Sequence, residues 1–230
     1  MQSRVKFGSF LRGIAFGAPA LFVATSLPVQ AQEPAGQTVV TAARYVDVLT
    51  GKTVEYPAIF VGPDGRITNI ADARVIKWGS DVKHINLGDK TLLPGLIDMH
   101  VHLDGPADIG GYRGLEFTDS FWGMTAVKNA RDMLDAGFTT VRNVGSDNRN
   151  DIGLKQAIEA GYAVGPRIVP AGYALGATGG HCDSTYLPPS LERKDGKEEG
   201  IGDSPDELRY QVRRQRKYGA EVIKVCATGG

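Results

Sequence analysis

Two histidines separated by one residue, His100 and His102, are the residues whose type and spacing most plainly suggest chemistry. They end the apolar run LLPGLIDMHVH, which is typical of a strand. Because side chains alternate between the two faces of a strand, both imidazoles are predicted to point the same way. Two converging neutral imidazoles are a natural start for a zinc-type metal site. Two buried histidines with satisfied hydrogen bonds are the alternative interpretation.

Lys224 is the second unusual residue, because it lies inside the apolar run EVIKVC. Burying an ammonium group without a partner is unfavourable. The lysine therefore either has a function or sends its amine to solvent or to a carboxylate at the strand end. Taken alone, the sequence favours the second interpretation.

The segment that must position these residues begins after Pro94 and alternates strands with helices. Such alternation favours a parallel sheet covered by helices. The helix over 204–218 has the clearest signals, with Ser204 as N-cap, Pro205 in the first turn and Gly219 as the stop. Strands are predicted over 95–102, 138–144, 167–171 and 220–226, and helices over 121–136, 151–160 and 204–218.

Two α/β architectures fit this alternation, an open doubly wound sheet and a (β/α)₈ TIM barrel. No G-x-G-x-x-G sequence follows the first strand, which argues against a dinucleotide-binding sheet. A complete barrel needs about 250 residues. We therefore predict that residues 94–230 hold about strands 1–4 of an incomplete barrel.

The segments before the barrel differ in character from it. Residues 32–93 contain short apolar runs separated by turns such as Pro63-Asp64-Gly65, which predicts a small β-rich domain. Residues 1–31 combine a basic start, an apolar stretch and small residues before the expected cut after Ala31, which is typical of a secretory signal peptide. We expect an exported protein, periplasmic or secreted. A membrane anchor is the alternative, but the apolar stretch is shorter than the roughly 20 residues of a span.

Charge limits the class of partner. The chain has 26 Lys and Arg residues against 26 Asp and Glu residues. Removal of the signal peptide takes away basic residues only. No electrostatic footprint for nucleic acid or an anionic membrane is left, so the expected partner is a small-molecule substrate. A homo-oligomer is left open.

Taken together, these segments resemble the amidohydrolase superfamily. LLPGLIDMHVH is similar to the metal-binding first strand of that family, and GFTTVRNVG, GPRIVPAG, TGGHCD and SPDELRYQVRRQRKYGAEVIKVCATGG resemble the blocks that follow it. The resemblance covers residues 38–230 and is strongest to the branch of imidazolonepropionase-related enzymes and Xaa-Pro dipeptidases. It implies an incomplete TIM barrel preceded by part of a small β-sandwich domain.

The resemblance also implies a site with two divalent metal ions, most simply zinc. By position, His100 and His102 would bind the more buried metal, and a carboxylated Lys224 would bridge both metals. The catalytic aspartate and two further histidines of the family are expected beyond residue 230. We therefore expect this chain to be inactive alone.

Three further residues are candidates for substrate binding or for support of the ligands. His181 follows two glycines in a loop that lines the active site in the family, or it is a loop histidine in solvent. Asp98 could orient a metal-binding histidine or act as a structural hydrogen-bonding residue. Arg142 could anchor a substrate carboxylate, although pairing inside the barrel is favoured. Asn143 replaces an aspartate that is common in the family, which removes a charge.

Cys182 and Cys226 are too few for a disulfide framework. Cys182 stands where the family usually has glycine, and Cys226 comes two residues after Lys224. Two unpaired thiols are expected, and a disulfide between them is the alternative.

The function predicted from these observations is metal-dependent hydrolysis, by metal-activated hydroxide, of amide or other C–N bonds. The substrates implied by the branch are dipeptides, or N-acyl amino acids. Cyclic-amide hydrolysis or deamination is a second hypothesis, although single-metal deaminases of the superfamily lack the bridging lysine. A non-catalytic remnant that binds a metal or ligand is the third.

Overall fold

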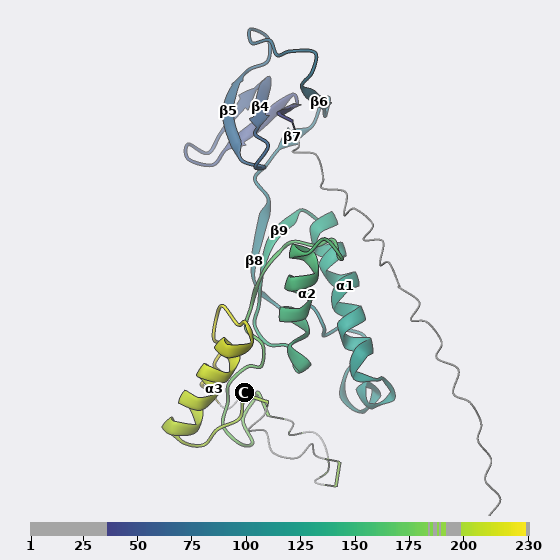
Figure 1. Ribbon diagram of the computed structural model, residues 1–230, viewed down its shortest axis with the longest axis vertical. Helices are drawn as coiled ribbons and strands as arrows, with labels where there is room; N and C mark the ends of the chain where they lie inside the picture. Colours follow the sequence, from purple (N-terminus) through teal and green to yellow (C-terminus); the bar gives the residue numbers. More distant parts are fainter. Residues whose placement is uncertain (1–35, 184, 186–187, 189, 192–198, 229–230) are drawn as a thin grey trace, which may run out of the picture. The chain divides into compact units, whose positions relative to one another are not determined.

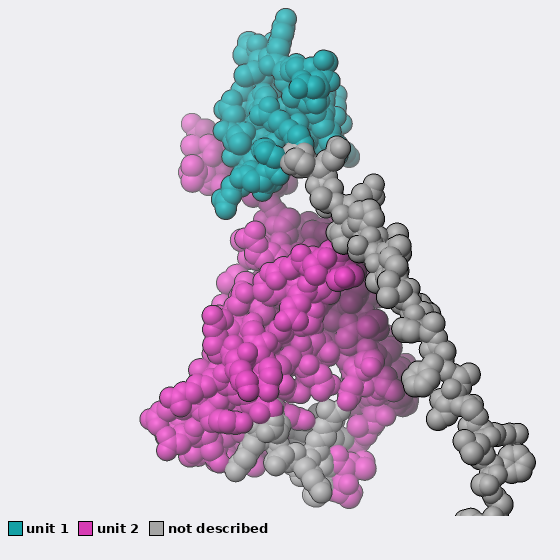
Figure 2. Space-filling model, viewed as in Figure 1, with its two compact units in different colours: residues 1–44, 55–90 teal, residues 45–54, 91–230 magenta. Residues whose placement is uncertain are grey.

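The computed structural model describes residues 36–183, 185, 188, 190–191 and 199–228 of the chain. The signal peptide expected at residues 1–31 lies outside the described residues. The structure divides into two compact units, coloured separately in Figure 2. Unit 1 holds the described residues up to Arg44 together with Glu55–Lys90, and unit 2 holds Tyr45–Val54 together with the described residues from Thr91 onward.

Unit 1 is built on a four-stranded sheet in the order β5-β4-β1-β6. The antiparallel pair β4–β5 is closed by the predicted turn, in which Gly65 has a φ of 76°. Strand β1 pairs antiparallel with β4 and parallel with β6. Val39, Ala58 and Phe60 form the buried core. The strands are β1 (Thr38–Thr41), β4 (Pro57–Val61), β5 (Ile67–Asp72) and β6 (Lys83–Asn86).

A separate three-stranded sheet has the order β3-β2-β7. Its short strands are β2 (Arg44–Asp47), β3 (Lys52–Glu55) and β7 (Thr91–Leu92).

The main sheet of unit 2 is parallel and has the order β10-β9-β8. Its strands β8 and β9 lie side by side in Figure 1. Its strands are β8 (Leu96–Val101), β9 (Phe138–Asn143) and β10 (Arg167–Pro170). The α-helices are α1 (Asp119–Asp135), α2 (Asn150–Glu159) and α3 (Pro205–Tyr218), with short 3₁₀ helices at Gly111–Glu116 and Asp147–Arg149. The predicted alternation of parallel strands and helices is confirmed for these elements.

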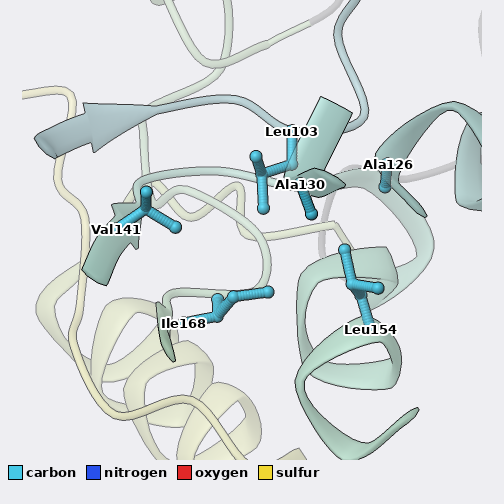
Figure 3. Close-up of a cluster of buried hydrophobic side chains, with 6 residues drawn as sticks. All are labelled: Leu103, Ala126, Ala130, Val141, Leu154 and Ile168. Atoms are coloured by element: carbon cyan, nitrogen blue, oxygen red, sulfur yellow. The ribbon is translucent and has the colours of Figure 1, made fainter. Parts of the chain in front are cut away.

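Helices α1 and α2 lie side by side and pack on one face of this sheet. Their small and aliphatic residues meet the sheet in one buried cluster, drawn in Figure 3: Leu103, Ala126, Ala130, Val141, Leu154 and Ile168. Burial of this apolar surface holds the strands at a fixed distance from the helices. The parallel pairing of β8 with β9 places their carboxyl ends, which carry His100 and Arg142, side by side.

Helix α3 begins and ends as predicted. The hydroxyl of Ser204 accepts the backbone N–H of Glu207, and Pro205 is the first helical residue. Gly219 ends the helix with a φ of 113°, a left-handed conformation that glycine adopts without steric cost.

The prediction of a strand over residues 220–226 is wrong. The amides of Glu221 and Val222 both donate to the carbonyl of Pro170, so the chain bends over the end of β10. Only Val225 forms a bridge, with Leu175. The physical reason lies in the neighbouring segment, where the amides of Gly172 and Tyr173 bond to side chains instead of to another strand.

Among the described residues, no helix combines the length and the apolar character required to cross a membrane.

Candidate metal-binding pocket

His100 and His102 lie next to each other at the carboxyl end of β8, with ring centroids 5.5 Å apart. Both side chains are exposed. His102 is held by a hydrogen bond of 3.1 Å between Nδ1 and the carbonyl of Gly145. A carbonyl oxygen can only accept, so Nδ1 carries the proton, and in the neutral ring Nε2 then keeps a lone pair. That tautomer is the one in which Nε2 can bind a cation.

Gly145 permits this contact because it has no side chain. Its φ is 144°, and a Cβ atom there would lie 3.3 Å from Cε1 of His102 and 3.6 Å from Cβ of Ala174. A larger residue would therefore be strained and would crowd the imidazole ring.

A cavity of about 470 Å³ opens beside His102. Its wall includes the apolar residues Ile109, Leu115 and Trp122 together with polar groups. The polar groups include Asp104, Ser146 and His181. His102 and His181 therefore both line this cavity. Among the described residues that line it, none is His100, Lys224, Asp98 or Arg142.

Lys224 is half-buried on the segment that follows α3. Its carbonyl accepts the amide of Leu175 at 2.8 Å, and the amide of Cys226 donates to the carbonyl of Leu175 at 2.8 Å. These two bonds hold the lysine backbone beside Leu175. Ala174, the residue before it, lines the cavity next to Gly145.

Cys182 and Cys226 form a disulfide, with Cα atoms 6.0 Å apart. The expectation of two unpaired thiols was therefore wrong. The sequence could not show this, because the pairing depends on residues 44 positions apart being brought together. The bond joins the loop of His181 to the segment of Lys224.

The loop that carries His181 is anchored at its base. The amide and the hydroxyl of Thr178 both donate to the carboxylate of Asp203, each at 2.8 Å. The amide of Gly179 donates to the carboxylate of Asp183. His181 itself is exposed at the cavity wall.

Asp98 and Arg142 make contacts within the sheet. The carboxylate of Asp98 accepts the backbone amide of His100 at 2.9 Å, and Nε of Arg142 donates to the carbonyl of Met99 at 2.7 Å. The β8–β9 pairing changes register between Asp98 and Val101. Strict alternation from Asp98 to the histidines is therefore interrupted, and its carboxylate turns to the backbone.

Sequence reasoning missed a buried polar cluster, of which Asp104 and Ser146 line the cavity. Asp104, Asn143, Ser146 and Asp151 are all buried. The carboxylate of Asp104 accepts the hydroxyl of Ser146 at 2.7 Å, and that hydroxyl accepts the amide of Asp151 at 3.1 Å. The only signal in the sequence was the unusual Asn143, because Asp151 reads simply as an acidic residue at the start of a helix.

Asp151 is the most deeply buried acid of this cluster. Burial raises the pKa of its carboxyl group, although amides from Gly172 and Ile152 and the side chain of Asn143 stabilise the ionised form. A buried carboxylate is unfavourable unless hydrogen-bond donors surround it. Asp151 therefore fastens the start of α2 to the ends of β9 and β10.

The described residues supply some, but not all, of the ligands that a divalent metal site needs. His102 presents Nε2 beside a cavity, His100 lies next to it, and nitrogen ligands of this kind suit zinc and related metals. No three His, Cys, Asp or Glu side chains converge on one point within the part of the chain that the structure describes. A complete site therefore needs ligands besides these two histidines.

Comparison with known proteins identifies the class. Residues 91–230 match the Amidohydrolase family, which is more than half of the chain. The chain therefore belongs to the amidohydrolase family, and the resemblance predicted from the sequence is confirmed.

Two curated proteins are similar to this chain over part of its length. The chain is 32% identical over 153 residues to ochratoxinase from Aspergillus niger, an alignment that covers 60% of this chain and 31% of that protein. It is 30% identical over 90 residues to imidazolonepropionase from Rhizobium rhizogenes, covering 39% of this chain and 21% of that protein.

Solved structures agree in fold. A Xaa-Pro dipeptidase with bound methionine in the active site has a TM-score of 0.72 and 30% identity, with 85% of this chain and 48% of that chain covered. The structure of A. niger ochratoxinase has a TM-score of 0.70 and 26% identity, with 86% of this chain and 48% of that chain covered. The chain thus spans about a third of A. niger ochratoxinase, about a fifth of the imidazolonepropionase and about half of these solved chains.

Proposed function

We propose that this protein is a hydrolase of amide or other C–N bonds in small substrates, with divalent metal ions bound by His100, His102 and a carboxylated Lys224. One observation carries the proposal. The tautomer of His102 set by Gly145 leaves Nε2 available for a cation beside a cavity of about 470 Å³. Membership of the amidohydrolase family supports the same reaction class.

The chain's own residues would contribute in distinct ways. His102 and His100 would supply neutral nitrogen ligands from one strand end. Lys224 would act after its amine has become a carbamate, because an ammonium has only donors whereas a carbamate has two acceptor oxygens. When bound, divalent metals polarise a carbonyl and lower the pKa of water so that a nucleophile forms at neutral pH.

The cavity suggests the size and character of the substrate. Its volume lies in the range of small-molecule sites, and its wall includes the apolar residues Leu115 and Trp122. We propose a dipeptide with C-terminal proline, or an N-acyl amino acid, as substrate. The similarity to a Xaa-Pro dipeptidase supports this choice. His181, at the cavity wall, would contact the substrate.

We also propose that the protein is exported under the direction of residues 1–31. The disulfide between Cys182 and Cys226 supports export, because disulfides persist mainly in oxidising compartments such as the periplasm.

The test is hydrolysis and metal content of the protein expressed from its complete reading frame. A panel of Xaa-Pro dipeptides and N-acyl amino acids should be cleaved, with about two metals bound per chain. H102A should lose metal and at least about 100-fold in kcat/KM. H84Q is the matched control, because His84 bonds to Thr41 within unit 1.

Normal metal content and rate in H102A would refute the assigned site. Absence of both metal and hydrolysis in the complete wild-type protein would favour a non-catalytic remnant.

A further inference from the structure

Asn143 is a fully buried side chain whose amide group bonds to three different parts of the chain. Its Oδ1 accepts the amide of Leu103 at 2.8 Å. Its Nδ2 donates to the carbonyl of Gly145 at 3.0 Å and to Oδ2 of Asp151 at 3.2 Å. Both donors and an acceptor of one side chain are thus used at the carboxyl end of β9.

Two of these bonds lie directly beside His102. Leu103 is the next residue along the chain, so the bond to its amide fixes the backbone just after the histidine. Gly145 supplies the carbonyl that accepts Nδ1–H of His102 at 3.1 Å. One carbonyl oxygen, with two lone pairs, therefore accepts hydrogen bonds from both Asn143 and His102.

Asp151 in turn orients the amide of Asn143. Its Oδ2 also accepts the amides of Ala171 and Gly172, each at 3.0 Å, so the carboxylate is held from the side of β10. A fixed acceptor at this position requires that Asn143 place its NH₂ group towards it. The oxygen of the amide must then face Leu103.

We propose that Asn143 is a positioning residue that fixes the orientation and tautomer of His102 for metal binding, through the carbonyl of Gly145 and the amide of Leu103. The inference rests on the proposed function, because it assigns a purpose to the tautomer of a proposed metal ligand. Groups that hold a ligand histidine typically contribute about 10–100-fold to metal affinity.

The same contacts explain why an amide and not a carboxylate stands here. A carboxylate would place an oxygen where Nδ2 now lies, against Oδ2 of Asp151 and the carbonyl of Gly145. Three acceptors would face one another in a buried space, which costs free energy unless a proton enters. The family's more common aspartate is therefore incompatible with this arrangement of partners.

The test uses N143D, which preserves the shape of the side chain, replaces the NH₂ donor by an acceptor oxygen and adds a negative charge when ionised. The full chain is labelled with ¹⁵N-histidine, and ring nitrogen chemical shifts are recorded without metal at about pH 8, where an ordinary histidine is neutral. The signals of His102 are assigned by their loss in H102Q. Wild type should show a protonated Nδ1 and an unprotonated Nε2, and N143D should show a mixture of tautomers.

N150D is the matched control. Asn150 donates to Asp104 at 3.1 Å in the same buried cluster, but its contact involves neither Gly145 nor Leu103. The tautomer of His102 should stay unchanged in N150D, although the protein is destabilised. Zn²⁺ affinity, measured by competition with a chelator, should fall about 10–100-fold in N143D and much less in N150D.

A folded N143D that keeps the wild-type tautomer would overturn the proposal. If N143D does not fold, wild type alone decides, because a protonated Nε2 on His102 would also overturn it. Lack of Zn²⁺ binding by wild type with the expected tautomer present would instead count against the proposed function.

Discussion

Cys182 and Cys226 are joined by a disulfide that ties the loop of His181 to the segment of Lys224. The loop contributes to the cavity wall, whereas the lysine segment is also held by backbone hydrogen bonds to Leu175 and Pro170. Parts of the candidate site that are far apart in sequence thus share one covalent link.

Reduction of this disulfide is expected to destabilise the protein. Closing a loop of 44 residues removes conformational entropy from the unfolded chain, worth about 2–4 kcal/mol. The free energy of unfolding, measured with denaturant, should fall by about that amount on addition of reductant. The double variant C182A/C226A should be equally destabilised and insensitive to reductant. Two titratable thiols in the unreduced, unfolded protein would contradict the prediction.

Lys224 is expected to carry a carbamate in the metal-loaded protein. Incubation with ¹³C-bicarbonate and zinc should yield one carbamate carbon signal by NMR, because only the carboxylated form offers oxygen ligands to a metal. K224M should lose the signal and bind fewer metal ions. K128M is the control, since Lys128 is exposed on α1 and pairs with Asp132. A signal that persists in K224M would assign the modification elsewhere.

Removal of the Asp151 carboxylate is expected to be strongly destabilising. D151A would leave the amides of Ile152 and Gly172 and the side chain of Asn143 without this acceptor. Each buried donor without a partner costs about 1–3 kcal/mol, so a loss of about 3 kcal/mol or more is predicted for the free energy of unfolding.

D135A is the comparison for that loss, because Asp135 forms an exposed ion pair with Arg131 that is worth at most about 1 kcal/mol. Equal effects of the two substitutions would show that the buried cluster contributes little.

The raised pKa of Asp151 also predicts a pH dependence. Burial makes the folded state hold the proton of this carboxyl group more tightly than the unfolded state does. Its contribution to stability is therefore complete below the unfolded pKa of about 3.9 and is lost as the pH rises through the raised value.

The stability difference between wild type and D151N should accordingly be larger at about pH 4 than at about pH 7. Denaturant unfolding at both pH values measures it. A difference that increases towards pH 7 would mean that the hydrogen bonds from Gly172 and Ile152 lower the pKa of Asp151 by more than burial raises it.

The N-cap of α3 provides a local prediction. S204A removes the acceptor of the Glu207 amide and should lower the free energy of unfolding by about 1 kcal/mol. S120A is the control, since Ser120 is exposed within α1. A cap variant as stable as the control would show that solvent satisfies the amide equally well.

Local features of this protein were predictable from the sequence because they depend on neighbours in the chain. Ser204, Pro205 and Gly219 mark the ends of α3 through their own hydrogen bonds and backbone preferences. The positions of β8, β9 and β10 followed from short apolar runs between turns. The spacing of His100 and His102 determined that their rings would lie close together, since both belong to one strand end.

Tertiary structure alone decided the remaining features. Residues 220–226 have the composition of a strand. The amides of Gly172 and Tyr173, however, already bond to Asp151 and Gln215, and only the single bridge of Val225 with Leu175 forms. The disulfide and the contacts of Asn143 join residues whose approach depends on how strands and helices pack. Such pairings join residues that are far apart in the sequence, so no short stretch of the sequence predicts them.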